Sequence, residues 1–390
     1  MNHSIRKRGF AAVSLAVLLA VAAPVAPASA QATRDKVLEI ISEASKAAGA
    51  KEVTWGAVSG GDAAFTVADW ETTVETDGKS TSIGAATVTY SGAKPTADGG
   101  FSAESIAATE MTVEGDDANV TIASLKITNY VGQSPEKIRA KTTSGERFDK
   151  IEATGIEVTD EKDQTIPIAA VTVTTSDFVA GVPRKIGFEM KGLVAPLDPN
   201  DEQTKEIAEL GYTSLTLDAA LVGAWDDKTG RVTIDQLAIG GADLGSLKLA
   251  MTLGGFTPEV VEALKKAEKD QAKQMELLQG ITVEKLSLRY EDASLAKRLI
   301  AAQAKKQGIP EDAFVQQIGA IVPMMVSAIG NKDFEAKIAK AVSLFLKTPK
   351  SLTVSANPAQ PTPVAAIMGA AMMAPQSLPT VLGADVKAND

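Results

Sequence analysis

The sequence predicts an α+β protein that is mostly β, with a long curved antiparallel sheet and a helical C-terminal portion. Over residues 53–194 and 212–256, turn residues separate strand-length segments in which apolar and polar residues alternate, as in half-buried strands. After residue 256, apolar residues recur at helical spacing and the segments end at glycines. Aromatic residues make up only 4% of the chain, which favours an extended sheet over a compact enzyme with a deep aromatic pocket. The sheet is expected to form either an open groove or two layers.

Residues 1–30 have the three parts of a secretory signal peptide. Basic residues occupy positions 6–8, an apolar run covers residues 10–25, and Ala28-Ser29-Ala30 supplies small residues for cleavage. The alternative, an uncleaved membrane anchor, is disfavoured because the run is shorter than the roughly 20 residues that span a bilayer. We therefore expect a periplasmic or secreted protein that keeps no transmembrane helix after cleavage.

The charge and the residue inventory exclude several classes of function. Removing residues 1–30 takes three basic and no acidic side chains from totals of 39 and 49, which leaves a formal charge of −13. Such a chain repels nucleic acid and anionic membranes. His3, the one histidine, lies in the signal peptide, and there is no cysteine. Histidine-ligated metals, Cys or Ser-His nucleophiles and disulfides are therefore excluded. We predict no catalytic, cofactor-binding or metal-binding residue.

The β-rich region, residues 31–256, is predicted to begin with a helix. Residues 33–48 carry apolar side chains at three- and four-residue spacing before Gly49, which predicts a short amphipathic helix that packs on the sheet. The expected elements that follow are a long series of strands at 53–194, a loop with a helix start at 196–211, and a three-stranded meander at 212–256.

A degenerate repeat runs through these strands: an apolar residue, a second residue at offset three, usually apolar or Thr, and another apolar residue at offset five. Its copies are Ile83/Ala86/Val88, Ile106/Thr109/Met111, Ile122/Leu125/Ile127, Ile151/Thr154/Ile156, Ile168/Val171/Val173, Ile234/Leu237/Ile239 and Val283/Leu286/Leu288. Side chains on one face of a strand recur at even offsets, so each copy switches face midway. Either a bulge inserts one residue, or the strand crosses between two buried surfaces. We expect a bulge or sharp bend at residues 231–239.

The C-terminal region, residues 257–390, is predicted to be mainly helical, with one or two strands that complete the sheet. The expected elements are helices at 257–280, 295–307, 311–329 and 334–346, strands at 281–290 and 352–356, and a short apolar helix at 364–373 within an irregular tail. Pro323 is expected to kink its helix.

Two acidic clusters have ordinary structural explanations. Asp226-Asp227 and Asp116-Asp117 lie between strands beside glycine, which favours hydrogen-bonded turns over paired catalytic carboxylates. A second cluster matches several oxygen positions of a calcium loop: Asp198, Asn200, Glu202 and Glu209. Gln203 occupies the place where that loop needs glycine, and acidity at a helix N-terminus explains the cluster without a metal.

Three further features also admit a functional and a structural interpretation. Residues 240–245 are glycine-rich, but they lie between strands and open no helix, which favours a loop over a phosphate cradle. Four lysines, Lys265, Lys266, Lys269 and Lys273, interleave with Glu262, Glu268, Asp270 and Glu276, which favours a solvated, ion-paired face. Five methionines are candidates for an adaptable lipid or peptide surface, although core packing is favoured: Met324, Met325, Met368, Met372 and Met373.

Residues 231–239 followed by 247–251 resemble the strand units of AsmA-like and related large envelope proteins, and residues 281–298 resemble them more loosely. The resemblance implies a periplasmic protein with a long curved sheet whose concave apolar face holds lipid chains. Members usually keep a membrane anchor, whereas this chain is expected to lose its apolar N-terminal segment.

We therefore expect a non-enzymatic periplasmic envelope protein that shelters an apolar ligand, such as an acyl chain, in a curved sheet. Its expected partners are lipid or another envelope protein, and not nucleic acid. The alternative is a structural or protein-interaction module of the envelope that uses its C-terminal helices. A third class, a carboxylate-only glycan hydrolase, requires two carboxyls roughly 5–10 Å apart in a cleft, and no sequence feature singles out such a pair.

Overall fold

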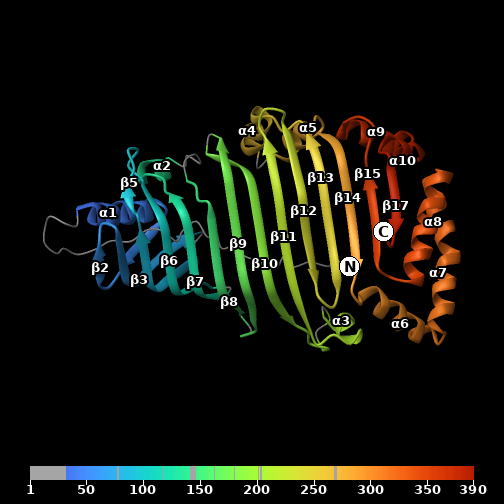
Figure 1. Ribbon diagram of the computed structural model, residues 1–390, viewed down its shortest axis with the longest axis horizontal. Coiled ribbons are helices and arrows are strands. Elements are labelled where there is room, and N and C mark those ends of the chain that lie inside the picture. Colours follow the sequence, from blue (N-terminus) through green and yellow to red (C-terminus); the bar gives the residue numbers. More distant parts are fainter. Residues whose placement is uncertain are drawn as a thin grey trace. The chain divides into compact units, whose positions relative to one another are not determined.

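The computed structural model describes residues 32–390 except 77–78, 117, 141–145, 162, 180, 201, 203 and 268–269 (Figure 1). The predictions for the signal peptide and for Asp117, Gln203, Glu268 and Lys269 fall outside the described residues. The chain divides into two compact units, residues 1–165 and residues 166–390. The composition change after residue 256 lies within the second unit.

Unit 1 is an antiparallel sheet with two helices. Its elements are α1 (Ala32–Ala47), β1 (Ala50–Thr54), β2 (Val58–Gly61), β3 (Ala64–Thr76), β4 (Lys79–Ser91), β5 (Lys94–Pro95), β6 (Phe101–Glu114), β7 (Ala118–Val131), α2 (Pro135–Arg139) and β8 (Lys150–Asp160). The main strands pair in the order β3, β4, β6, β7, β8. Both β1 and β2 pair with β3, and β5 pairs with β6. The short helix α2 is absent from the sequence prediction.

Helix α1 forms as predicted and buries its apolar stripe. Val37 and Ile41 of α1 are fully buried. Phe65, Val67 and Trp70 of β3 are each at most 2% exposed. The helix ends before Gly49, whose φ of +103° suits glycine. Unit 1 therefore has a conventional packed core of a helix on one side of a sheet.

The strands of unit 1 switch face together, which keeps their apolar residues on the buried side. In β4 the buried residues are Ile83 and Ala85, then Val88 and Tyr90, yet the pairing with β3 stays in register on both sides of the switch. The residues at which the strands switch face are neighbours across the strands. Residues with positive φ alternate with alanines in this line: Asp69, Ala86, Glu110, Ala123 and Gly155. The predicted face switch is confirmed, and here no strand gains an extra residue.

Unit 2 is a single open antiparallel sheet with helices at its margins. Its elements are β9 (Thr165–Val179), β10 (Val182–Pro196), α3 (Lys205–Glu209), β11 (Ser214–Asp226), β12 (Arg231–Gly241), β13 (Gly245–Gly254), α4 (Pro258–Lys266), α5 (Gln271–Leu278), β14 (Thr282–Asp292), α6 (Leu295–Gln307), α7 (Glu311–Val326), η2 (Ser327–Ile329), α8 (Lys332–Lys347), β15 (Ser351–Ala356), β16 (Thr362–Pro363), α9 (Val364–Met373), η3 (Pro375–Ser377), α10 (Leu378–Val381) and β17 (Ala384–Ala388). The strands pair in the order β9 to β15 and then β17, with β16 on β14. The predicted fold class and the predicted meander are confirmed.

The expected bulge in residues 231–239 is present in β12. Ile234 pairs with Met251 of β13, whereas Leu237 pairs with Leu249, so β12 has one more residue than its partner between these pairs. The pairing register between β12 and β11 also shifts at this place. Because of the extra residue, Ile234 and Leu237 point to the same face despite their odd spacing.

Two predictions for the C-terminal region are wrong in detail. The helix predicted at 257–280 is two helices, because Ala267 ends α4 and the Asp270 side chain caps α5 by accepting from the Lys273 backbone N–H at 3.0 Å. The tail predicted to be irregular contains β17, which pairs along β15 from Leu352↔Ala388 to Ala356↔Ala384. Its five residues, Ala384–Ala388, are too few for their alternation to stand out in the sequence.

Candidate functional site

One face of the unit 2 sheet is built from apolar side chains, which lie opposite one another across six strands. We call it the apolar face and define it by three rows of cross-strand neighbours. The rows are Met190, Ala219, Ile239, Leu247, Tyr290 and Leu352; Phe188, Leu221, Leu237, Leu249, Leu288 and Val354; and Ile186, Gly223, Ile234, Met251, Leu286 and Ala356. None of the eighteen residues is charged, and Tyr290 is the only one with a polar side-chain group.

The large side chains of the apolar face are partly open to solvent. Six of them are between 39% and 52% exposed: Ile186, Leu237, Ile239, Leu247, Leu288 and Val354. Among the helix–strand pairs whose backbones lie close together in the described part of the chain, none includes β10, β11, β12 or β13. Proteins rarely leave a continuous apolar area of this kind uncovered unless it binds something. The apolar face is therefore the leading candidate site.

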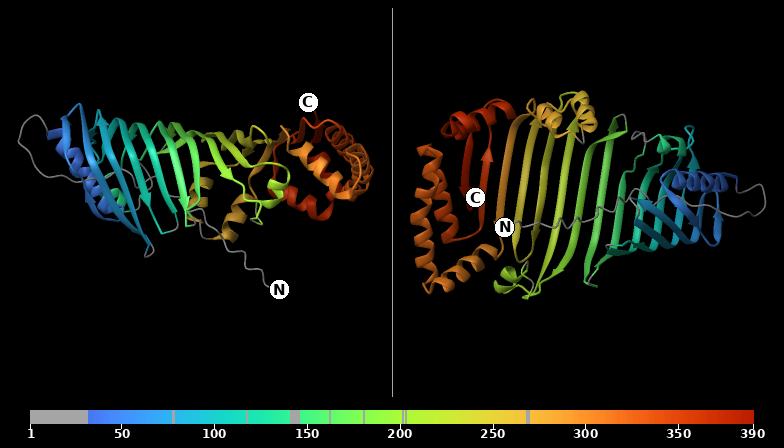
Figure 2. Two further views of the ribbon diagram at one scale, coloured as in Figure 1. Left: turned by 90° about the horizontal axis from the view of Figure 1, so that it is seen from below. Right: turned by 180° about the vertical axis from the view of Figure 1, so that it is seen from behind.

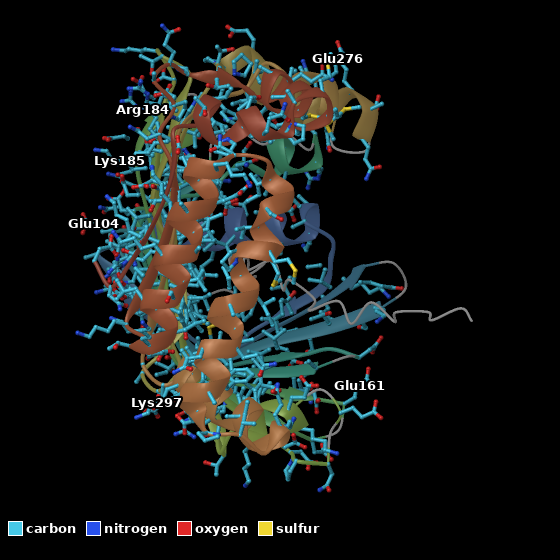
Figure 3. All side chains as sticks on the ribbon, turned by 90° about the vertical axis from the view of Figure 1, so that its right-hand side faces the viewer. Glu104, Glu161, Arg184, Lys185, Glu276 and Lys297 are labelled. Carbon is cyan, nitrogen blue, oxygen red and sulfur yellow. The ribbon has the colours of Figure 1, made fainter. Side chains whose placement is uncertain are left out.

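Helices border the apolar face and leave its middle open. Phe345 of α8 packs edge-on against Tyr290, with 6.0 Å between ring centroids. Trp225, next along β11 on the same face, donates its indole N–H to the carbonyl of Phe256 at 2.7 Å, immediately before α4. Helices α4 and α5, gold in Figure 2, stand on one side of the sheet. Glu276 of α5 and Lys297 of α6 lie at opposite ends of the strands (Figure 3).

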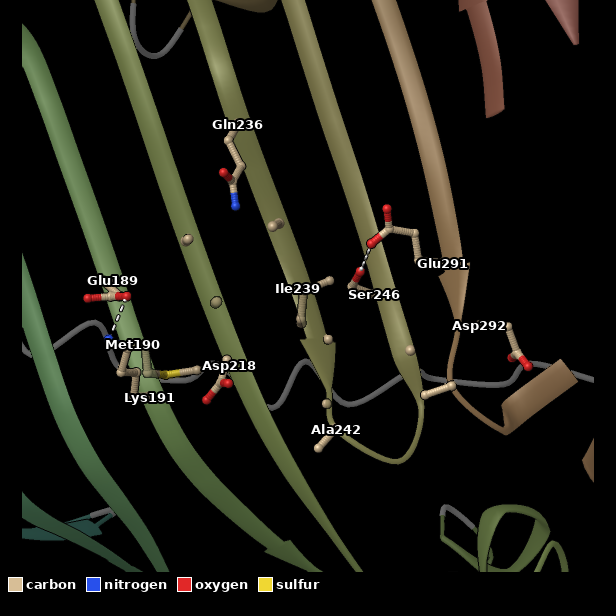
Figure 4. A pocket seen from close by; sticks show the side chains of 17 residues that line it. Glu189, Met190, Lys191, Asp218, Gln236, Ile239, Ala242, Ser246, Glu291 and Asp292 are labelled. Carbon is tan, nitrogen blue, oxygen red and sulfur yellow. Dashed lines mark hydrogen bonds and ion pairs between the residues drawn. The ribbon is translucent and has the colours of Figure 1, made fainter. Parts of the chain in front are cut away.

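The opposite face of the same strands is polar and carries an open pocket of about 460 Å³. Alanines on β11 and β12 form its floor, and charged or polar residues surround them (Figure 4): Glu189, Lys191, Asp218, Gln236, Ser246 and Glu291. The predicted loop at residues 240–245 is only 242–244 in the structure, because Gly240 and Gly241 belong to β12 and Gly245 to β13. It lies at one end of this pocket. Three residues of the apolar face, Met190, Ala219 and Ile239, also line this pocket. Glu189, Lys191, Asp218 and Glu291 belong to the polar face, so the sheet is amphipathic.

Two carboxylates of this pocket, Glu189 and Glu291, form ion pairs. Lys191 pairs with Glu189 at 2.9 Å, which raises the pKa of Lys191. Hydrogen bonds from Lys248 and Arg289 lower the pKa of Glu291 to about 2. A glycan hydrolase needs one carboxyl whose pKa is raised so that it can donate a proton. The pairing of Glu189 and Glu291 is instead typical of a solvated ionic surface.

The predicted aspartate turn after β11 is confirmed. Asp226 accepts hydrogen bonds from the backbone N–H of Lys228 at 3.0 Å and from the Thr229 hydroxyl at 2.8 Å, and these lower the pKa of Asp226. Asp227 is not paired with Asp226 but forms a salt bridge with Arg184 at 3.1 Å. The two carboxylates therefore have separate structural partners.

The cluster that partly matches a calcium loop does not converge on one point. The Asp198 carboxylate accepts from the backbone and side-chain N–H groups of Asn200 at 2.8 and 3.1 Å, whereas Glu209 pairs with Lys306 at 3.4 Å. Within the described residues, no group of three or more acidic or histidine side chains could hold a metal ion.

Two further predictions from the sequence have different outcomes. Lys273 pairs with Glu276 at 2.8 Å and Lys266 with Glu262 at 4.0 Å, as expected for a solvated ion-paired face. The expected core packing of the five methionines is wrong. Their exposed fractions are 71% and 70% for Met324 and Met325, and 44%, 84% and 88% for Met368, Met372 and Met373.

One described helical segment, Glu311–Ile329, is long and apolar enough to cross a membrane by length and composition. It comprises α7 and η2, and only 6% of its most apolar stretch is buried. Pro323 lies inside α7. This exposed apolar segment adds a second unusual surface to unit 2.

A family model described as an uncharacterized protein matches residues 238–389. The match begins within β12 and ends in the last residues of the chain, so it includes half of the apolar face and all helices from α4 onward. No curated protein matches the chain.

Proposed function

We propose that the protein is a non-enzymatic periplasmic envelope protein that shelters an acyl chain on the apolar face of unit 2. The observation that carries the proposal is the exposure of six large aliphatic side chains, 39% to 52% each, on a face without a charged residue. The secretory pattern of residues 1–30 supports the location.

The chemistry of the apolar face favours hydrocarbon as the ligand. Its three rows contain no donor or acceptor side chain except Tyr290, whose hydroxyl donates to the Asp292 carboxylate at 2.6 Å. A polar ligand would lose its hydration there without gaining hydrogen bonds in return. An acyl chain gains about 0.8 kcal/mol for each CH₂ group that leaves water.

The dimensions of the sheet also suit an acyl chain. A strand of 11 residues, such as β12 or β14, extends for roughly 36 Å at about 3.3 Å per residue. A row across six strands extends for roughly 24 Å at about 4.8 Å per strand spacing. Either direction accommodates an extended chain, while the helices at the margins are placed to shield it.

Native mass spectrometry of the gently purified protein tests the proposal. We expect bound molecules that a lipid extract identifies as acyl-bearing. The double variant Leu237→Gln, Leu249→Gln should lose them. Val222→Gln is the matched control, because Val222 is 46% exposed and points to the opposite face of β11. A ligand-free wild type, or a dimer that buries the apolar face against itself, would overturn the proposal.

A further inference from the structure

A second exposed apolar surface lies at one end of the C-terminal helices, apart from the apolar face. Met324 and Met325 at the end of α7 are 71% and 70% exposed, and Met372 and Met373 at the end of α9 are 84% and 88% exposed. Buried methionines are ordinary core fillers, but these four are among the most exposed apolar residues of the described chain. We call this set the methionine tip.

The segments that follow the two methionine pairs contact each other, although the pairs are almost 50 residues apart in sequence. Asn331, two residues after the end of η2, donates its side-chain N–H to the carbonyl of Gln376 in η3 at 3.0 Å. A Cβ added at Gly330 would lie 3.2 Å from the Cβ of Gln376. The turn after η2 therefore contacts η3, and α9 and α10 lie across the upper end of the α7–α8 pair in Figure 3.

Both segments that form the methionine tip lack charged residues. Residues 313–331 contain no Asp, Glu, Lys or Arg, and residues 351–384 contain none over 34 positions. The same chain is 23% charged overall. Charged residues follow these two segments in the sequence and form salt bridges. Lys332 pairs with Glu335 at 3.1 Å, and Lys337 pairs with Asp385 at 3.0 Å.

These features select a lipid bilayer as the partner of the methionine tip. A protein interface usually has a rim of charged and polar groups around an apolar centre and fits its partner closely. Exposed apolar residues on segments without charges, followed by ion pairs, match the order of hydrocarbon and headgroups in a membrane. The apolar α7–η2 segment, of which 6% is buried, continues this surface.

We propose that the methionine tip inserts into the surface of a bilayer and anchors unit 2 there without relying on charge. The inference goes beyond the proposed acyl-chain site, because it concerns different residues and a lipid bilayer in place of a single bound acyl chain. It fails or holds independently: a protein without a bound acyl chain can still bind vesicles, and one with a bound chain can fail to.

Flotation of the full chain with neutral phosphatidylcholine vesicles tests this proposal. We expect the wild type to float, and the bound fraction to persist in about 0.5 M salt, because no surface charge is involved. The double variant Met324→Glu, Met372→Glu should lower the partition coefficient at least tenfold. The matched control is Met275→Glu in α5, where the methionine is 52% exposed but lies outside the tip, and it should bind like the wild type.

Two results would overturn the proposal. One is a wild type that stays in the dense fraction with neutral vesicles. The other is equal loss of binding in the Met275→Glu control, which would mean that general acidity and not the tip decides binding. A concentration-dependent dimer that Met372→Glu dissociates, without vesicle binding, would assign the tip to a second copy of the chain instead.

Discussion

Phe345 of α8 packs edge-on against Tyr290 of β14, with ring centroids 6.0 Å apart and an angle of 70° between the planes. This contact covers part of the apolar face at β14, although Leu288 of β14 and Val354 of β15 are still 39% and 40% exposed. Towards β10, Leu237 and Ile239 are 44% and 52% exposed. Apolar side chains on that part of the face therefore remain in contact with water.

The first prediction contrasts the open face with the packed core of unit 1. Leu237→Gln should change the free energy of unfolding by no more than about 0.5 kcal/mol, because the side chain is already half in water. Ile41→Ala removes a fully buried side chain and should cost about 2–5 kcal/mol. Urea unfolding of both variants measures the difference. A loss of several kcal/mol at Leu237 would mean that something in the chain covers the apolar face.

A second prediction concerns the line of face switches in unit 1. Gly155 has a φ of +60°, and an added Cβ would lie 2.8 Å from the Cβ of Ala123. Gly155→Ala therefore combines backbone strain with a steric clash and should destabilise by about 1–3 kcal/mol.

Gly319→Ala in α7 is the matched control for this prediction. A Cβ at Gly319 meets nothing within 4 Å, and alanine favours a helix by about 1 kcal/mol over glycine. Thermal unfolding should show a lower midpoint for Gly155→Ala and an equal or higher one for Gly319→Ala. A neutral Gly155→Ala would contradict a strict requirement for positive φ at the switch.

The third prediction follows from the ion pairs on the polar face. The pKa of Glu291 is lowered to about 2 by Lys248 and Arg289, below its usual value of about 4.5. A lowered pKa adds stability above the unfolded pKa, and this stability is lost as the pH falls from about 4.5 to about 2. Because the Glu291 side chain is 37% exposed, solvent screening limits the contribution to about 1 kcal/mol or less.

Glu291→Gln should therefore flatten the pH dependence of the free energy of unfolding between about pH 4.5 and pH 2. The measurement is urea unfolding at several pH values in low salt, and the difference from wild type should shrink in high salt. Parallel curves for the variant and the wild type would show that the ion pairs with Lys248 and Arg289 contribute nothing.

Most of the fold could be predicted from alternation and helical spacing. The strands at residues 214–254 and the helices that end at Gly308 and Gly330 are where the sequence pattern places them. The repeat also predicts the bulge between Ile234 and Leu237, because an extra residue is one way for a strand to keep two residues at an odd offset on one face. Patterns of this kind depend only on residues that are close together in the sequence, so they can be interpreted without the fold.

The candidate site was harder to predict, because it depends on which part of the sheet is left uncovered by the rest of the chain. The apolar face has the alternation of an ordinary half-buried strand, so the exposure of Leu247 and Leu288 cannot be read from their spacing. The exposure of the methionines could not be predicted for the same reason. Met372 and Met373 are apolar, as core residues usually are, and only the fold places them in the methionine tip. The absence of charge over residues 351–384 was the available signal.

The most direct test of the central claim is photo-crosslinking with a fatty acid that carries a diazirine in its chain, followed by peptide mapping. We expect adducts to concentrate on the apolar face, at Leu221, Leu237, Leu249 and Leu288, and an excess of unlabelled fatty acid to remove them. Labelling of the polar face around Gln236, or labelling spread evenly over the surface, would contradict the claim.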